Sequence, residues 1–410
     1  MGNAMEGRAS VDAARTDALP LMAIPLLSLA AFSVSVSARI IDPLLPLFTA
    51  EFNISLGMAS ASVTLFAIAY GIAQIIFGPL GDRFGKYKVI ALVSVASAFS
   101  ALLCGFAQNF STLLAGRLLA GLTAAAVIPL SMAWIGDVVA YQHRQTVLAR
   151  FMVGQILGVS AGAFFGGLVA DSLSWRMPFF VMAFIFLATG IALLYLNRRL
   201  PARTGRVGRV TPSIFRSTIS EFRLVLGNPW AKIVLVCVFL EGTFIFGALS
   251  FIPAYIYESF GTSLTVAGSL LMLFGLGGLS FVLCAKQALR QFGERGLVCI
   301  GGLLAGVSLI AMGLAPAWWW TVPCCFIAGF GFYLLHNTLQ VNATQMAPER
   351  RGVAVSAFAA SFYLGQATGV SAGGMVLMVT RTSHVLVIGG AGVLLVAMAF
   401  FCTLRHRPAA

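Results

Sequence analysis

The chain has 410 residues, of which 59% are hydrophobic and only 10% are charged. A soluble domain carries about a quarter charged residues, so this composition excludes an ordinary soluble globular protein. The formal net charge is +13, but the bases are spread over short segments. We therefore expect no nucleic-acid partner, because a nucleic-acid-binding domain gathers its bases on one face.

The N-terminal segment, residues 1–22, is polar and has no apolar signal-peptide core of its own. It is typical of a cytoplasmic tail ahead of a first span that serves as an uncleaved signal. The seven cysteines all lie in apolar runs, as small buried side chains do, and their spacing favours neither a disulfide framework nor a zinc site. We expect no metal site and no cofactor.

Twelve apolar runs follow, each close to the 20 or so residues that a helix needs to cross the hydrocarbon layer. The first six are Ala23–Phe48, Ala59–Leu80, Val89–Ala107, Thr112–Ile135, Val147–Ala170 and Met177–Leu196. The second six are Trp230–Ile252, Leu264–Cys284, Leu297–Leu314, Thr321–Val341, Val353–Val376 and Val385–Leu404. The pattern predicts an all-α integral membrane protein with twelve transmembrane helices.

A polar segment, residues 197–229, holds seven arginines and divides the chain into two parts. We expect an N-terminal bundle of six helices over residues 23–196, a basic cytoplasmic linker, a C-terminal bundle over residues 230–404, and a tail over residues 405–410. With the N-terminus inside, 22 of the 26 Lys and Arg fall on the cytoplasmic side and two fall outside. The positive-inside rule then predicts that both termini are cytoplasmic.

The two parts of the chain resemble each other. The stretch GQILGVSAGA at Gly154–Ala163 recurs as GQATGVSAGG at Gly365–Gly374, displaced by 211 residues. Parallel repeats of this kind predict two six-helix bundles related by a pseudo-twofold axis along the membrane normal, with a central site between them, as in an alternating-access carrier. The glycines spaced by four in the first copy are expected to allow close helix packing.

A charged stretch, GPLGDRFGKYK, interrupts the apolar pattern at Gly78–Lys88. Its bases and glycines suit a tight cytoplasmic turn under the positive-inside rule. That interpretation leaves Asp82 unexplained, because an acid helps neither the topology nor the turn.

The spacing Gly-x-x-x-Asp-Arg-x-Gly-Lys resembles the signature loop between spans two and three of the major facilitator superfamily. The resemblance covers the whole chain and is strongest for the twelve-span proton-coupled drug and metabolite exporters. Four further stretches carry it: Asp42-Pro-Leu-Leu-Pro46, Leu113-x-x-x-Arg117-x-x-x-Gly121, Trp175-Arg-Met-Pro-Phe179 and Pro348-Glu-Arg-Arg-Gly352.

The resemblance implies a gating loop. An aspartate is stabilised by the positive end of a helix dipole and by unpaired N–H groups, and the family places the start of span eleven beside this loop. We therefore expect Asp82 to bind that helix end when the carrier faces outward, and Lys86 to pair with Asp137 at the end of span four. The residues assigned to the gate are Gly78, Asp82, Arg83, Gly85, Lys86 and Asp137.

Two places depart from the family pattern. The family's antiporter motif in span five has a Gly-Pro pair, and this chain has Gly162-Ala163 instead. The missing proline weakens an antiporter assignment, because that residue bends the helix in the family, and it leaves uniport open. The second-half copy of the charged loop has Arg290 where the acid would stand.

Ionisable residues inside spans cost at least about 2.5 kcal/mol each and are functional by default. Arg39 and Asp42 share a helix face and are candidates for substrate or proton binding, or for a pair that merely neutralises itself. Glu241 has no charged partner within a helical turn, so it is a candidate proton carrier. The alternative is a protonated glutamate bonded across helices. For Arg117 the resemblance implies proton coupling or a structural bond to span one.

Polar and aromatic residues inside spans are candidates for lining the cavity. The polar ones are equally compatible with bonds between helices, and aromatic ones often face lipid. The candidates are Tyr70, Gln74, Gln155, Phe244, His336, Asn337, Gln340 and Gln366.

The leading hypothesis is a monomeric secondary transporter of the inner (plasma) membrane that exports a small, drug-like or metabolite compound in exchange for protons. The alternatives are proton-coupled uptake of an organic anion, with Arg39 and Arg117 as counter-charges, and a receptor or scaffold that no longer transports. We expect no enzyme, because the chain has no paired metal ligands, nucleophile elbow or phosphate loop.

Overall fold

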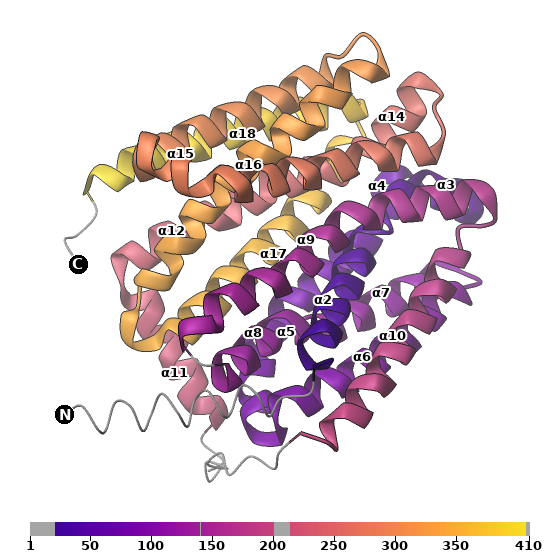
Figure 1. Cartoon of the computed structure of the whole chain (residues 1–410). Coiled ribbons are helices and arrows are strands. Elements are labelled where there is room, and N and C mark those ends of the chain that lie inside the picture. Colours follow the sequence, from indigo (N-terminus) through magenta and orange to yellow (C-terminus); the bar gives the residue numbers. More distant parts are fainter. Residues whose placement is uncertain (1–20, 140, 201–213, 407–410) are drawn as a thin grey trace, which may run out of the picture.

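The computed structural model describes residues 21–139, 141–200 and 214–406, and every regular element within them is a helix (Figure 1). The first half of the chain contains α2 (Ala23–Arg39), α3 (Leu45–Phe52), α4 (Leu56–Ala59), α5 (Ala61–Phe84), α6 (Lys86–Gly105), α7 (Phe110–Ala124), α8 (Val127–Val138), α9 (Tyr141–Ser172) and α10 (Met177–Asn197). The second half contains α11 (Ile214–Gly227), α12 (Pro229–Glu241), α13 (Gly247–Leu249), α14 (Ile252–Phe260), α15 (Leu264–Gly313), α16 (Thr321–Gln345), α17 (Arg351–Val376) and α18 (Thr382–Thr403).

The helix α15 accounts for two of the predicted spans. The described residues contain 11 helices long and apolar enough to cross a membrane, and α15 is one of them with 50 residues. Glycines at 277 and 301 both approach the same part of α16, near Phe330 and Gly331. A straight helix would hold positions 24 residues apart about 36 Å from each other, so α15 folds back on itself. The reversal lies at Gly293, whose φ of 62° and ψ of 176° suit only glycine.

The first span of each half is interrupted, which differs from the continuous spans predicted from the sequence. In the first half, α2 ends at Arg39 and the 3₁₀ turn η1 (Asp42–Leu44) precedes α3. Pro43 and Pro46 lie at this break, where each lacks an N–H for the helix ladder. In the second half, a π-helix, η2 (Gly242–Phe246), directly follows Glu241, and such π-helical turns occur frequently at functional sites.

A ladder of glycines on α9 packs against α2. A Cβ added at Gly154, Gly158 or Gly166 would lie 2.6, 2.4 or 2.3 Å from the carbonyl oxygens of Ser28, Phe32 and Ile40, respectively. The carbonyls recur every four residues, as the glycines do, so the two backbones run side by side in register. The close packing expected from the glycine spacing is present.

The second half repeats this ladder. A Cβ at Gly365 or Gly369 would lie 2.0 or 1.9 Å from the carbonyl oxygens of Phe239 and Thr243. Each of these four positions lies 211 residues after its counterpart in the first half, the same offset as the sequence repeat. The buried hydrophobic residues likewise divide into one large cluster for each half. The two halves are therefore two copies of one helical bundle.

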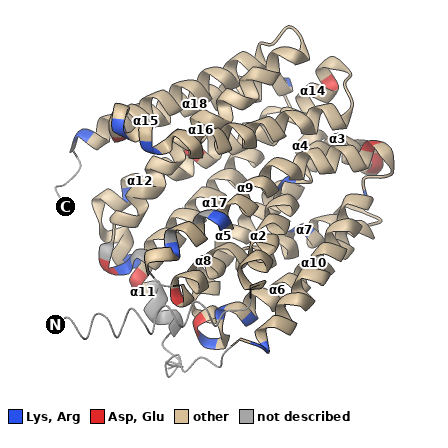
Figure 2. Cartoon of the chain, viewed as in Figure 1, with Lys and Arg blue, Asp and Glu red and all other residues tan. Residues whose placement is uncertain are grey.

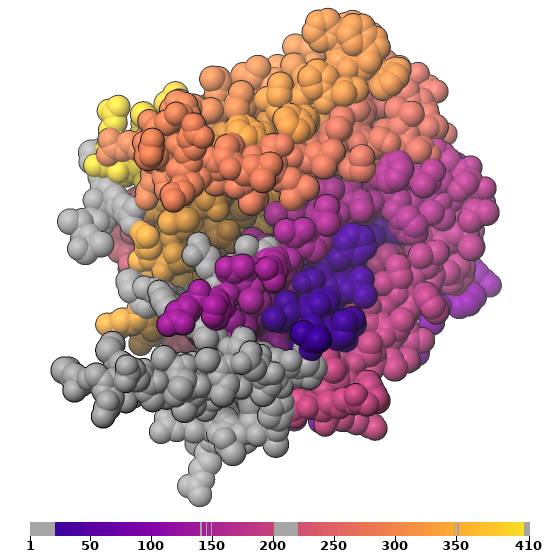
Figure 3. Space-filling model, viewed as in Figure 1, coloured from indigo at the N-terminus to yellow at the C-terminus, as the bar shows by residue number. Residues whose placement is uncertain are grey.

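Two helix pairs form most of the contact between the halves: α5 packs against α17, and α9 packs against the first arm of α15. Side chains meet across the first pair, where Ser371 Oγ donates to Thr64 Oγ1 at 3.2 Å. Figure 3 shows atoms of α9 and α15 in contact on the right of the view. Toward the left the surface between the halves is hollowed, with atoms of α17 behind.

Charged residues gather at the two ends of the bundle (Figure 2). We call the end that holds the α5–α6 turn, α11 and the C-terminal end of α18 the basic end, and the end that holds α3, α4 and α14 the opposite end. Part of the linker expected over residues 197–229 forms the helix α11, with residues 214–227. The tails expected at 1–22 and 405–410 lie largely outside the described residues, as does most of the arginine-rich stretch.

Candidate functional site

Asp42 and Arg39 form a buried ion pair at the break in the first span. Their side chains are 0% and 6% exposed, and Arg39 Nη1 donates to Asp42 Oδ2 at 3.2 Å. The second carboxylate oxygen, Oδ1, has no hydrogen-bond partner among the described residues. The Arg39 guanidinium lies 4.2 Å above the ring of Phe246 in η2, so this pair touches the other half.

Glu241 forms a second pair, which lies across helices as in the alternative interpretation and not within its own helical turn. His336 Nδ1 on α16 lies 2.8 Å from Glu241 Oε2. The glutamate side chain is 0% exposed and the histidine 18%. The other glutamate oxygen, Oε1, has no partner among the described residues. The sequence could not reveal the pair, because its members are 95 residues apart and the rotation of each helix was unknown.

Aromatic rings surround His336. Phe332 of α16 stacks on the imidazole at 4.9 Å between centroids, and Phe362 and Phe358 of α17 lie 5.0 and 5.4 Å away. Phe246 contacts both Phe332 and Phe362, at 5.2 and 5.0 Å. The rings therefore complete a continuous line of contacts from Asp42 through Arg39 and Phe246 to His336 and Glu241.

Arg117 is held by backbone oxygens rather than by an acid. The side chain is fully buried on α7, where Nη1 donates to Ser37 O at 3.0 Å and Nε to Ser62 O at 3.2 Å. Its guanidinium also lies 4.4 Å from the ring of Phe66. Arg117 thus ties α7 to α2 and α5. Of the two roles implied by the resemblance, the bond to span one is present in this geometry.

The predicted cavity-lining residues separate into those at the boundary and those inside one half. Tyr70 of α5 is buried and stacks on Tyr363 of α17, with 3.9 Å between ring centroids, so it lies at the boundary. Phe244 instead packs on α18, where a Cβ at Gly392 would meet its ring at 2.1 Å; the aromatic at the boundary is Phe246. The predicted amides fall into buried ones, Gln74 and Gln366, and half-buried ones, Gln155, Asn337 and Gln340.

The charged loop forms a network at the basic end. Lys86 Nζ lies 2.8 Å from Asp137 Oδ2 on α8, the pair expected from the sequence, and 3.0 Å from Asp82 Oδ1. Asp82 is therefore paired within its own loop in this conformation, and its side chain is 70% exposed. Gly85, with φ of 89°, separates α5 from α6, and a Cβ at Gly81 would lie 2.5 Å from Leu130. The other assigned residues, Gly78 and Arg83, are exposed.

Asp171 is a functional candidate that the sequence did not single out. It lies near the end of α9 and accepts from the N–H of Thr265 at 2.7 Å and of Leu264 at 3.3 Å, the first residues of α15. It also accepts from Thr265 Oγ1 at 2.7 Å. A carboxylate of the first half thus caps a helix of the second half at the opposite end. A lone aspartate at a span boundary gave no sequence signal for this contact.

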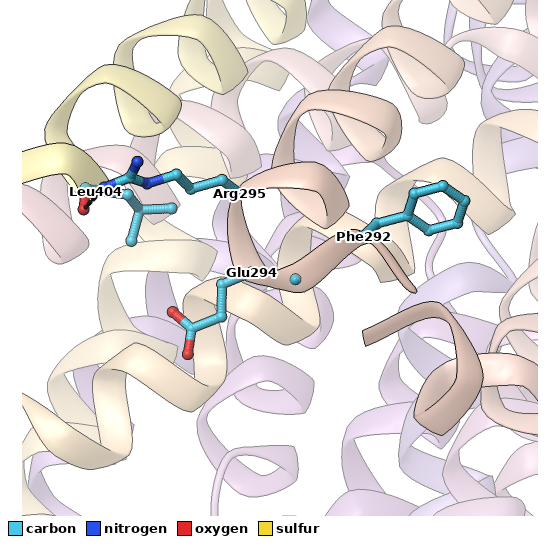
Figure 4. Close-up of a pocket in the computed structure, with 5 residues that line it drawn as sticks. Phe292, Glu294, Arg295 and Leu404 are labelled. Atoms are coloured by element: carbon cyan, nitrogen blue, oxygen red, sulfur yellow. Dashed lines mark hydrogen bonds between the residues drawn. The ribbon is translucent and has the colours of Figure 1, made fainter. Parts of the chain in front are cut away.

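A cavity of about 460 Å³ lies at the basic end of the second half, away from these residues. Phe292, Glu294, Arg295 and Leu404 line it, and Figure 4 shows Arg295 reaching toward Leu404 while the ring of Phe292 points away. Arg295 Nη2 donates to Leu404 O at 3.1 Å. The cavity therefore lies between the reversal of α15 and the end of α18. None of the predicted site residues lines it. Among the described residues, no cluster of three or more His, Cys, Asp or Glu could hold a metal ion.

Comparisons with known proteins agree with this architecture. The protein named "Uncharacterized MFS-type transporter YceJ" of Bacillus subtilis (strain 168) is 25% identical over 356 residues, covering 85% of this chain and 88% of that protein. The Quinolone resistance protein NorB of Staphylococcus aureus (strain MRSA252) is 24% identical over 389 residues, covering 81% and 83%.

The fold is also found among solved structures. The crystal structure of a bacterial homolog to the human lysosomal transporter Spinster, in an inward-facing and unoccupied conformation, has a TM-score of 0.75, 17% identity, and coverage of 94% of this chain and 98% of that one. A sequence profile of the Major Facilitator Superfamily matches residues 27–370 and 248–410. The chain therefore belongs to the Major Facilitator Superfamily and is an integral, multi-pass membrane transporter.

Proposed function

We propose that the protein is a proton-coupled exporter that moves a small, drug-like or metabolite compound by alternating access. The line of contacts between Asp42 and Glu241 carries this proposal. Each acid lies at the interruption of the first span of its half, and both are fully buried. Ionisable side chains inside the membrane are expensive and mark ion or substrate pathways, and this line crosses the boundary that must change when the carrier alternates.

The basic end is the cytoplasmic side in this proposal, and both termini are cytoplasmic in the inner (plasma) membrane. The contacts of α9 with α15 and the cap at Asp171 close the opposite end. The hollow visible in Figure 3 is directed toward the basic end. The described conformation is therefore the inward-facing one, in which the substrate enters from the cytoplasm.

The substrate is a compound with an apolar, aromatic body and at least one polar group. Phe246, Phe332 and Phe362 offer ring contacts, and the ion pair of Arg39 and Asp42 offers a charged contact beside them. The relative NorB is named for quinolone resistance, and a quinolone combines these features. We use norfloxacin as the probe for this reason.

The purified protein in liposomes tests the proposal. Vesicles with an acidic lumen should accumulate norfloxacin more than protein-free vesicles do, and a protonophore should abolish the difference. Accumulation that does not depend on the pH gradient would support a uniporter. Ala163, which stands in place of the family's proline, leaves that mechanism open. If norfloxacin does not move, a thermal-shift screen of other organic compounds supplies the next probe.

Uptake of an organic anion is the second candidate, and the charge balance decides against it. It would require Arg39 and Arg117 as free counter-charges. Asp42 already pairs with Arg39, and Arg117 donates to two backbone oxygens, Ser37 O and Ser62 O. A receptor or scaffold that does not transport would show binding in the thermal-shift screen and no flux.

A further inference from the structure

The pair of Glu241 and His336 has an inner and an outer member. Glu241 is enclosed at 0% exposure, whereas the His336 side chain is 18% exposed. The Nδ1 edge of the imidazole faces the carboxylate at 2.8 Å, so the Nε2 edge is the one left for other partners. Of the two members, His336 is therefore the one that water reaches first.

The surroundings of the pair contain few other titratable groups. Cys237 lies one turn before Glu241 on α12, and Tyr333 lies one turn before His336 on α16. From α17 the neighbouring side chains are Phe358 and Phe362, and α18 faces η2 with Gly389 and Gly392. Thiol and phenol groups are ordinarily uncharged near neutral pH, and Arg39, which reaches this cluster through Phe246, keeps its charge. With one added proton, the pair of Glu241 and His336 is neutral overall. Without that proton the pair carries a net negative charge in a buried site, and the desolvation cost of that charge is high unless the halves rearrange.

The other buried acid is a poorer proton carrier. Asp42 is 3.2 Å from Arg39, and a guanidinium does not lose its proton in proteins. Protonating Asp42 would leave the buried Arg39 without its counter-charge. An imidazole, in contrast, changes charge near neutral pH, so a carboxylate paired with histidine can gain and lose a proton without stranding a permanent charge.

The pair is also positioned to sense the arrangement of the halves. Phe358 and Phe362 contact His336 from α17, and Tyr363, the next residue along α17, stacks on Tyr70 of α5. When α5 separates from α17, the face of α17 that carries Tyr363, next to these rings, loses its cover from the first half. Access of water to Nε2 is thereby linked to the carrier's conformation.

We propose that Glu241 and His336 together form the proton-exchange site of this carrier. The proton enters at Nε2 of His336 while Nδ1–H is donated to the Glu241 carboxylate, and it leaves by the reverse path. Arg39 and Asp42 then serve the substrate and not the proton. This inference rests on the proposed proton-coupled transport, but part of its test needs no substrate.

Histidine-selective NMR of the full-length protein tests the site directly. The chain has four histidines, so the His336 signal is identified by its loss in His336→Gln. Between about pH 5 and pH 8, the range in which imidazole titrates, this signal should move, and Glu241→Gln should shift its titration midpoint by about one pH unit or more. Glu258→Gln, at the opposite end, should leave the midpoint unchanged. The proposal would be overturned if the His336 signal does not move with pH, or if its titration midpoint is the same in the wild type and in Glu241→Gln.

Transport of norfloxacin gives the second readout. Glu241→Gln and His336→Gln should lose accumulation driven by a pH gradient and keep exchange of labelled against unlabelled probe without a gradient. The matched controls Glu258→Gln and His384→Gln should keep both. Gradient-driven accumulation at the wild-type level in either pair variant would refute the site. If the wild type does not move norfloxacin, the proposed substrate class fails, and the NMR titration still decides the site.

Discussion

Asp171 and Asp82 are two carboxylates at the two ends of the first half. Asp171 binds the first N–H groups of α15, which belongs to the second half. Four such N–H groups at a helix start have no partner within the helix, and the positive end of the dipole adds to the attraction. Asp82 is bound instead to Lys86 of its own loop. We infer that the two acids bind helix starts of the second half in turn, Asp171 in one conformation and Asp82 in the other. The conformation described here is the one in which Asp171 is bound to the start of α15.

Replacing Asp171 with Asn should weaken the closed state of the opposite end. The lost contact is worth up to about 2 kcal/mol, so the population shifts toward the outward-facing state. Spin labels at Leu173 and Trp319, both exposed, should report longer distances in Asp171→Asn. Glu258→Gln is the matched control, because Glu258 accepts from Thr382 within its own half. Unchanged distances in Asp171→Asn would show that Asp171 does not hold the opposite end closed.

Asp82→Asn should slow transport strongly while expression and thermal stability stay close to those of the wild type. An exposed ion pair of this kind contributes about 0.2–1 kcal/mol at most, so the fold does not depend on it. The substitution instead destabilises the outward-facing conformation, in which Asp82 would cap the start of α17. Norfloxacin flux measures the effect, with Glu221→Gln on α11 as the control. Normal flux in Asp82→Asn would contradict the proposed contact of Asp82 with the start of α17.

At the scale of elements, the glycine ladders fix how α2 lies on α9 and α12 on α17. The ladders could be predicted from the sequence, because a spacing of four on a helix places residues on one face. The break at η1 had a sequence signal in Pro43 and Pro46, although the length of the apolar run favoured one continuous span. The π-helix η2 had no such signal. The pair of Glu241 and His336 escaped prediction for a related reason: it depends on the rotation of two helices, and periodicity does not fix that rotation. Lys86 and Asp137 were predictable only through the family resemblance.

Gly158→Ala should destabilise the protein. The new Cβ would lie 2.4 Å from Phe32 O, and neither backbone can move without disturbing the rest of the ladder. Overpacking of this kind costs about 1–3 kcal/mol, visible as a lower thermal midpoint in detergent. Gly136→Ala, in the helix α8, has no atom within 4 Å of the new Cβ and should be neutral or slightly stabilising. Equal midpoints for the two variants would refute the ladder's role.

At the scale of the whole molecule, the account depends on which end faces the cytoplasm. In a background without the seven native cysteines, a cysteine at position 209 should stay protected from a membrane-impermeant reagent added to intact cells. A cysteine at Arg381, at the opposite end, should react. Labelling of position 209 from outside would show that the chain has the opposite orientation in the membrane. The direction of transport that we propose would then be reversed as well.

The most direct test of the central claim is the proton movement that substrate causes. Proteoliposomes are prepared at equal pH inside and outside with a pH-sensitive dye in the lumen, and norfloxacin, or the first compound found by the screen, is added outside. An exchanger moves protons out as the compound enters, so the account predicts that the lumen becomes more alkaline, and that Glu241→Gln abolishes the change. Acidification of the lumen would indicate proton-coupled uptake in the same direction as the substrate. A constant lumenal pH while the compound enters would contradict proton coupling altogether.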